Sequence, residues 1–92
     1  MKVTVYFWGI LGDYFGVPQT ELELKSPATR QRLLDELGSR FGPRLPSQLW
    51  DHRENRFIPG VHLVGRNGDL DNPESPVVEG DEVNILMPIA GG

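Results

Sequence analysis

The stretch that decides the fold is EGDEVNILMPIAGG, residues 79–92. Within it Val83, Ile85 and Met87 alternate with other residues, and this period of two is typical of a β-strand. Pro88 has no N–H to donate to a neighbouring strand, so strand pairing is expected to end there. The stretch therefore predicts a last strand over residues 82–87 with a short tail behind it.

Three earlier segments also predict strands. Residues 2–9 and residues 20–25 alternate, and the connector between them is rich in glycine, which predicts a β-hairpin. Residues 61–64 predict a third strand that ends at the turn dipeptide Asn67-Gly68. The next segment, residues 69–76, is polar and contains prolines, so it predicts a loop.

One amphipathic helix is predicted between these strands. Its apolar residues recur at helical spacing on one face: Leu33, Leu34, Leu37 and Phe41. Thr29 is the favoured N-cap and Ser26 the alternative, while Gly42-Pro43 ends the helix. Gly38 lowers the helix propensity, which indicates close packing at that position. Residues 43–60 have no clear period and predict a long connection with one helical turn near residues 47–50.

The predicted order β-β-α-β-β indicates a two-layer α+β domain with one sheet and one main helix. A right-handed crossover after the helix would make a later strand parallel to an earlier one. The 92 residues leave room for a single domain.

Composition excludes several classes of function. The chain has no cysteine, which removes disulfides, thiolate metal sites and cysteine nucleophiles. Its net charge of −4 argues against nucleic acid as a partner. No apolar run is long enough to cross a membrane and no signal peptide precedes the first strand, so we expect a soluble, cytoplasmic protein without a membrane partner.

Charge is unevenly distributed along the chain. From Arg66 onward there are six acids and one arginine. This pattern fits ordinary solvated surface. Alternatively, it fits an acidic flank beside the C-terminus that steers docking onto a basic partner.

Gly91 and Gly92 form the most informative motif. Glycine has no side chain and tolerates most backbone conformations, so a Gly-Gly end could pass through a narrow channel into the active site of another protein. It would also leave the terminal carboxylate sterically bare for attack on ATP. Two terminal glycines arise by chance in about one chain in two hundred, so the motif is informative only together with the predicted fold.

At this point the sequence resembles the MoaD/ThiS family of ubiquitin-like β-grasp sulfur carriers, most closely its molybdopterin synthase small subunits. The resemblance covers essentially the whole chain and depends on a few motifs: residues 8–13, the helix start Ala28-Thr29, residues 79–83 and residues 88–92. It implies a ubiquitin-like β-grasp domain over residues 1–88, a mixed sheet packed on one main helix, and a flexible tail at residues 89–92. Gly12 replaces an arginine that is usual in the family.

The resemblance also implies a chemistry for the tail. A ubiquitin-activating-type adenylyltransferase would use ATP to adenylate Gly92, and sulfur would then convert it to a thiocarboxylate. A larger subunit, like that of molybdopterin synthase, would hold the pterin precursor that accepts the sulfur. Gly91 and Gly92 would have the transfer role, and Pro88, Ile89 and Ala90 would set the reach of the tail. The chain itself would be a carrier, not an enzyme, and would bind no cofactor.

Partner docking is expected to come from the folded part. Tyr6, Trp8 and Leu86 fall on strand faces opposite the predicted core residues, so together they could form an exposed apolar patch. The alternative is that Trp8 packs under the connection at residues 43–60.

Metal binding and rival functions complete the predictions. There are two histidines, His52 and His62, and they lack cysteine partners for a metal. The loop with Asp69, Asp71 and Glu74 lacks the glycine and the terminal glutamate of a calcium loop, so no metal site is expected. Rival functions are a protein modifier conjugated through Gly92, a carrier for thiamine, tRNA thiolation or cysteine synthesis, and a non-covalent β-grasp interaction domain.

Overall fold

A computed structural model describes residues 1–87 of the chain as a mixed sheet covered by one main helix. The five-stranded sheet has the order β2-β1-β9-β6-β7, and its strands are β1 (Lys2–Phe7), β2 (Gln19–Glu23), β6 (His62–Gly65), β7 (Gly68–Asp69) and β9 (Glu82–Leu86). β1 and β9 are parallel, and the other pairs are antiparallel. The predicted α+β architecture is confirmed. Pro88 and the predicted tail at residues 89–92 lie outside the described residues.

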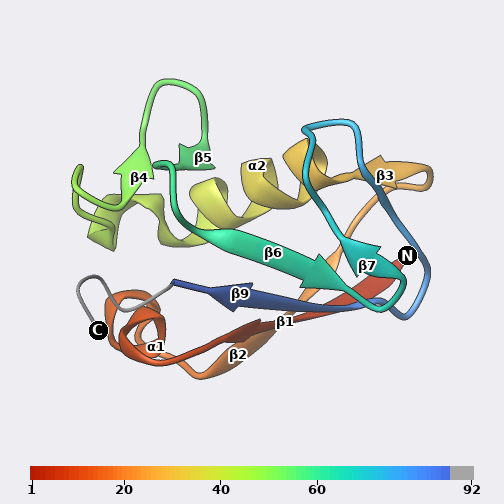
Figure 1. Ribbon diagram of the computed structural model, residues 1–92, viewed down its shortest axis with the longest axis horizontal. Helices are drawn as coiled ribbons and strands as arrows, with labels where there is room; N and C mark the ends of the chain where they lie inside the picture. Colours follow the sequence, from red (N-terminus) through yellow and green to blue (C-terminus); the bar gives the residue numbers. More distant parts are fainter. Residues whose placement is uncertain (88–92) are drawn as a thin grey trace.

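Helix α2 (Arg30–Phe41) lies along one face of this sheet (Figure 1). Thr29 is its N-cap, as predicted, and the Thr29 hydroxyl accepts from the backbone N–H of Arg32 at 3.2 Å. The helix passes into a short 3-10 helix, η1 (Gly42–Arg44), where Pro43 breaks the α-helical pattern. The buried leucines of the predicted stripe pack onto the strand residues of the core: Val3, Val5, Phe7, Leu22, Leu63, Val83 and Ile85.

The glycine-rich connector between β1 and β2 is helical, which the sequence did not predict. It forms α1 (Ile10–Phe15), between Gly9 and Gly16, whose φ angles of 60° and 80° suit glycine. The helix buries Phe15, whose ring stacks on that of Phe7 with centroids 4.0 Å apart. A helix of six residues is too short for its apolar period to stand out in a sequence.

The connection at residues 43–60 contains a second structure that the sequence did not predict, a small hairpin of β4 (Trp50–Asp51) and β5 (Arg56–Phe57). Trp50 is buried and meets the Phe57 ring edge-on, with centroids 4.9 Å apart. The predicted turn before it is present, since the N–H groups of Leu49 and Trp50 both donate to the Pro46 carbonyl. A Cβ on Gly38 would lie 3.1 Å from the Trp50 ring, which explains the glycine in the helix.

The hairpin turn is closed by the Asp51 side chain. Its carboxylate accepts hydrogen bonds from the backbone N–H groups of Glu54 at 3.1 Å and Arg53 at 2.9 Å. These two bonds, helped by the charges of Arg56 and Arg53, stabilise the ionised form and hold the pKa of Asp51 below its ordinary value. This carboxylate therefore has a local structural role.

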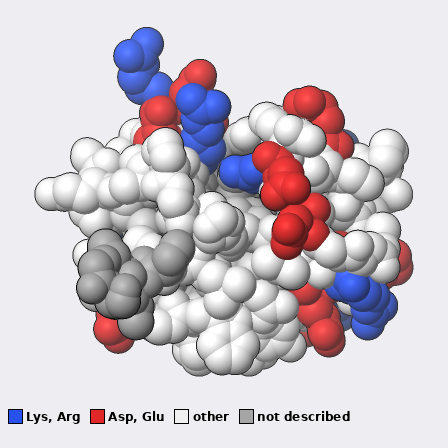
Figure 2. Space-filling model, viewed as in Figure 1, with Lys and Arg blue, Asp and Glu red and all other residues white. Residues whose placement is uncertain are grey.

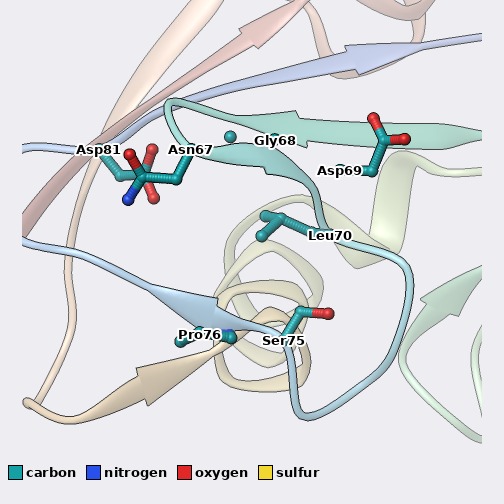
Figure 3. A pocket seen from close by; sticks show the side chains of 8 residues that line it. Asn67, Gly68, Asp69, Leu70, Ser75, Pro76 and Asp81 are labelled. Carbon is teal, nitrogen blue, oxygen red and sulfur yellow. The ribbon is translucent and has the colours of Figure 1, made fainter.

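The Asn67-Gly68 turn joins β6 to β7 as predicted, and the loop that follows ends in β8 (Pro76–Val77), which pairs with β3 (Ala28–Thr29). Asp81, immediately before β9, is buried behind the turn (Figure 3). Its carboxylate accepts from the backbone N–H groups of Arg66 at 2.8 Å, Val78 at 3.1 Å and Glu82 at 2.9 Å. One side chain thus connects the turn, the loop and the start of the last strand.

No helix within residues 1–87 is long and apolar enough to cross a membrane.

Candidate functional site

The ends of the strands form two edges of the sheet, and the last strand, β9, ends in the middle of one of them. β9 lies between β1 and β6, and because β1 and β9 are parallel, both strands end on the same side. Phe7 is level with Ile85, and the Trp8 N–H donates to the Ile85 carbonyl at 3.2 Å. Figure 1 shows this edge at the end of the molecule opposite the N-terminus. We call it the tail edge, because residues 88–92 continue from Met87 at this point.

Large apolar side chains are exposed beside the tail edge. Trp8 is 55 % exposed and Leu86 38 % exposed, and the register places them side by side on neighbouring strands, on the face away from α2. Tyr6 lies on the same face but is half-buried. The predicted patch is therefore present for Trp8 and Leu86 and only partial for Tyr6. The alternative position for Trp8, packed under the loop at residues 43–60, is wrong, because Trp8 is exposed and its indole bonds to Asn84 on β9.

Ile10, which the sequence analysis missed, is 53 % exposed and follows Trp8 by two residues. It is the first residue of α1, which turns its buried residues Leu11 and Phe15 inward and leaves Ile10 outside. No sequence signal could have identified it without the helix. Trp8, Ile10 and Leu86 are the large hydrophobic residues exposed among residues 1–87. Trp8 and Leu86, which the register places side by side, are hereafter the apolar patch.

Charged groups are sparse over part of the surface. In Figure 2 most charged side chains lie in the upper and right-hand parts of the view, and the lower centre carries few. Of the six acids from Arg66 onward, Asp81 is buried and the other five are exposed, with the Glu79 carboxylate accepting from the Lys2 N–H at 3.1 Å. A steering role for the remaining exposed acids stays a prediction.

The two histidines lie on different elements, His52 in the turn between β4 and β5 and His62 on β6. His62 is exposed and is paired with Leu86 on the same face of the sheet, and His52 bonds through its Nε2 to the Leu45 carbonyl at 3.0 Å. No group of three histidine or carboxylate side chains within residues 1–87 could hold a metal ion.

Comparison with protein families gives one match that spans the site. A family model described as the ThiS family matches residues 5–92, which includes β9 and the residues that follow it. No curated protein matches the sequence significantly.

Solved structures share the fold. SAMP1 from Haloferax volcanii superposes with a TM-score of 0.82 at 17 % identity, over 100 % of both chains. A Pyrococcus furiosus protein assigned as subunit 1 of a molybdopterin converting factor gives 0.73 at 19 % identity, over 97 % of this chain and 99 % of that chain. A chain of the Amycolatopsis orientalis BexX/CysO complex gives 0.67 at 26 % identity, covering 98 % and 99 %. The predicted ubiquitin-like β-grasp fold is confirmed.

Proposed function

The chain belongs to the ThiS family of ubiquitin-like β-grasp proteins, and from this premise we propose that it is a sulfur carrier that reacts through the carboxyl group of Gly92. The observation that carries the proposal is the family match through Gly92, on a fold whose last strand ends beside an exposed apolar patch. The acceptor that we propose is the pterin precursor of molybdopterin, by the likeness to the Pyrococcus furiosus subunit.

The proposed reaction makes a poor electrophile reactive in two steps. A carboxylate oxygen of Gly92 attacks the α-phosphorus of ATP, pyrophosphate leaves, and an acyl-adenylate forms. Sulfide (HS⁻), supplied by a sulfur donor, then attacks the acyl carbon, AMP leaves with the bonding electron pair, and the thiocarboxylic acid loses its proton to give a thiocarboxylate. All catalytic side chains, and the ATP, belong to the activating enzyme, so this chain is a carrier without activity of its own. Because the reaction uses ATP, we place it in the cytoplasm.

Two kinds of partner follow from this reaction. A ubiquitin-activating-type adenylyltransferase would take the tail first, and a larger subunit that holds the acceptor would take it next. Gly91 and Gly92 enter the active site of each, while Pro88, Ile89 and Ala90 set the distance from Met87. One structural neighbour, in the BexX/CysO complex, was solved with a partner protein, which supports docking of this fold on another protein.

A second candidate is a protein modifier, favoured by the likeness to SAMP1, the small archaeal modifier protein 1. It shares the adenylation of Gly92 but ends in an amide bond to a lysine amino group. A candidate of another class is a β-grasp domain that only binds its partner, without covalent chemistry. Carriers for thiamine, tRNA thiolation or cysteine synthesis differ only in the acceptor.

The intact mass of the protein separates these candidates. After incubation with ATP, a cognate activating enzyme and a sulfur donor, we expect a mass gain equal to the exchange of one oxygen for sulfur, localised to Gly92 by fragmentation. A mass that corresponds to an amide-linked conjugate with no thiocarboxylate supports the modifier. An unchanged mass with an activating enzyme that is competent on its own substrate contradicts both, and supports the binding domain.

Replacing Trp8 tests the apolar patch. Trp8→Ala should weaken binding to the cognate activating enzyme about 30- to 140-fold, because an aromatic anchor at an interface contributes about 2–3 kcal/mol. Trp8→Phe keeps most of the apolar area and should lose much less. Isothermal titration calorimetry without ATP measures both. Equal affinity for wild type and Trp8→Ala would show that the partner docks elsewhere; the exposed position predicts little change in unfolding temperature.

A further inference from the structure

Trp8 is held in place although more than half of its surface is exposed. Its indole Nε1–H donates to the Oδ1 atom of Asn84 at 2.7 Å. Asn84 lies on β9, level with Tyr6 on β1 and Val64 on β6, and all three are half-buried on the sheet face away from α2. An exposed tryptophan normally samples several side-chain conformations, so this bond restricts the Trp8 side chain to the arrangement in which its Nε1–H meets Asn84.

The bond also fixes which way the Asn84 amide points. The indole nitrogen can only donate, so the atom that meets it must be the amide oxygen. The amide nitrogen therefore lies on the other side, and its two N–H groups have no hydrogen-bond partner among the described side-chain contacts. The indole, in turn, has used its single donor, so what it offers to a partner is apolar surface.

We infer that Asn84 is a positioning and specificity-determining residue for partner docking: it pre-orders Trp8 for an apolar recess and donates its amide N–H groups to an oxygen acceptor at the rim of that recess. The partner surface is thus a recess lined by apolar side chains with a carbonyl or carboxylate oxygen beside it. This inference depends on the proposed docking through the apolar patch.

Asn84 would strengthen binding to the right partner in two ways. Immobilising a large side chain on binding costs about 0.5–1.5 kcal/mol, and a side chain that is already ordered avoids much of this cost. A partner that offers no acceptor would bury the amide N–H groups without a bond, which disfavours the wrong partner. Asn84 would therefore affect both affinity and the choice of partner.

Two substitutions separate the two roles. Asn84→Ala removes the acceptor for Trp8 and the donors for the partner, whereas Asn84→Asp keeps the acceptor and removes only the donors. Asn72→Asp, in an exposed loop, is the matched control for the added negative charge. The free chain is examined first by NMR, through the hydrogen exchange of the Trp8 indole N–H. Binding to the cognate activating enzyme is then measured without ATP or sulfur donor.

We expect the indole N–H to exchange slowly in wild type, Asn84→Asp and Asn72→Asp, and much faster in Asn84→Ala. Affinity should fall about tenfold or more in Asn84→Ala and by a severalfold factor in Asn84→Asp, with no change in Asn72→Asp. In a Trp8→Ala background the effect of Asn84→Ala should shrink to that of the lost donors.

Unchanged indole exchange in Asn84→Ala would overturn the positioning role. Wild-type affinity in Asn84→Asp would overturn the donor role, and equal losses from Asn84→Ala with and without Trp8 would show that the two residues act separately. These results do not depend on sulfur chemistry. If the mass experiment fails while these variants behave as expected, docking stands and the carrier function does not; if wild type binds no activating enzyme, the docking inference falls with it.

Discussion

Adding a single alanine after Gly92, or deleting Gly92, is expected to abolish formation of the thiocarboxylate completely while leaving the fold unchanged. The added residue moves the free carboxylate one residue beyond the point to which the channel of the activating enzyme delivers it, and places a methyl group beside it. The deletion leaves the carboxylate of Gly91 short of the α-phosphorus of ATP by a similar distance. Reactions that depend on alignment lose most of their rate from displacements of about 1 Å, and one residue spans about 3.3 Å.

The measurement is the intact mass after a full reaction, with urea unfolding curves to show that the folded part is intact. Among residues 1–87 the buried core residues lie between Val3 and Ile85, so we expect neither change at Gly92 to alter the midpoint. The matched control inserts one alanine in the exposed loop at Asn72, which also lengthens the chain but keeps the tail. A sulfur gain in the extended chain equal to wild type would mean that Gly92 is not the reacting residue.

The central sheet and its helix could be predicted from the sequence because their signals are local. Val5, Phe7, Val83 and Ile85 are buried because strict alternation puts each of them on the face that α2 covers. Thr29 is the N-cap because its hydroxyl bonds to a backbone N–H only three residues away. Such features need no knowledge of the rest of the chain.

The segments that the sequence left unassigned depend on distant neighbours. The two tryptophans are chemically identical, yet Trp50 is buried and Trp8 is exposed. What separates them is the gap that Gly38 leaves in α2 and the Phe57 ring across the β4–β5 hairpin, both beyond the reach of a local pattern. The two-residue strands of that hairpin are also too short to display a period.

In the candidate site, too, some residues could be predicted from the sequence and others could not. Its tail residues could be identified from the motif and the resemblance, and their roles remain predictions. Trp8 and Leu86 could be assigned to exposed strand faces, but their position side by side depends on parallel pairing between the first and last strands. The bond between Trp8 and Asn84 spans 76 residues of sequence, and no single-sequence pattern encodes it.

Asp81→Ala is expected to be the most destabilising substitution among the carboxylates of residues 1–87. The Asp81 side chain is 3 % exposed, and its two oxygens accept three backbone N–H bonds from three separate segments. Alanine would leave these partly buried donors without partners, at about 1–3 kcal/mol for each donor that water cannot reach. We expect a loss of about 2–4 kcal/mol, against about 5–14 kcal/mol for the whole free energy of unfolding of a chain this long.

Urea unfolding and thermal melting measure this loss, and the melting temperature should fall by about 10–25 °C in a domain of this size. Asp69→Ala is the matched control, since Asp69 is an exposed carboxylate on the same β6–β7 hairpin, and it should change the free energy of unfolding by less than about 0.5 kcal/mol.

Asp81→Asn should lose an amount of stability between those of the two alanine variants. Its amide oxygen can still accept from Arg66 and Glu82, but its NH₂ group meets the Val78 N–H, donor against donor. If Asp81→Ala and Asp69→Ala unfold at the same urea concentration, the three hydrogen bonds of Asp81 make no net contribution to the free energy of unfolding. In that case the turn and β9 are held in register by the apolar core alone, and the position of the tail edge would not depend on Asp81.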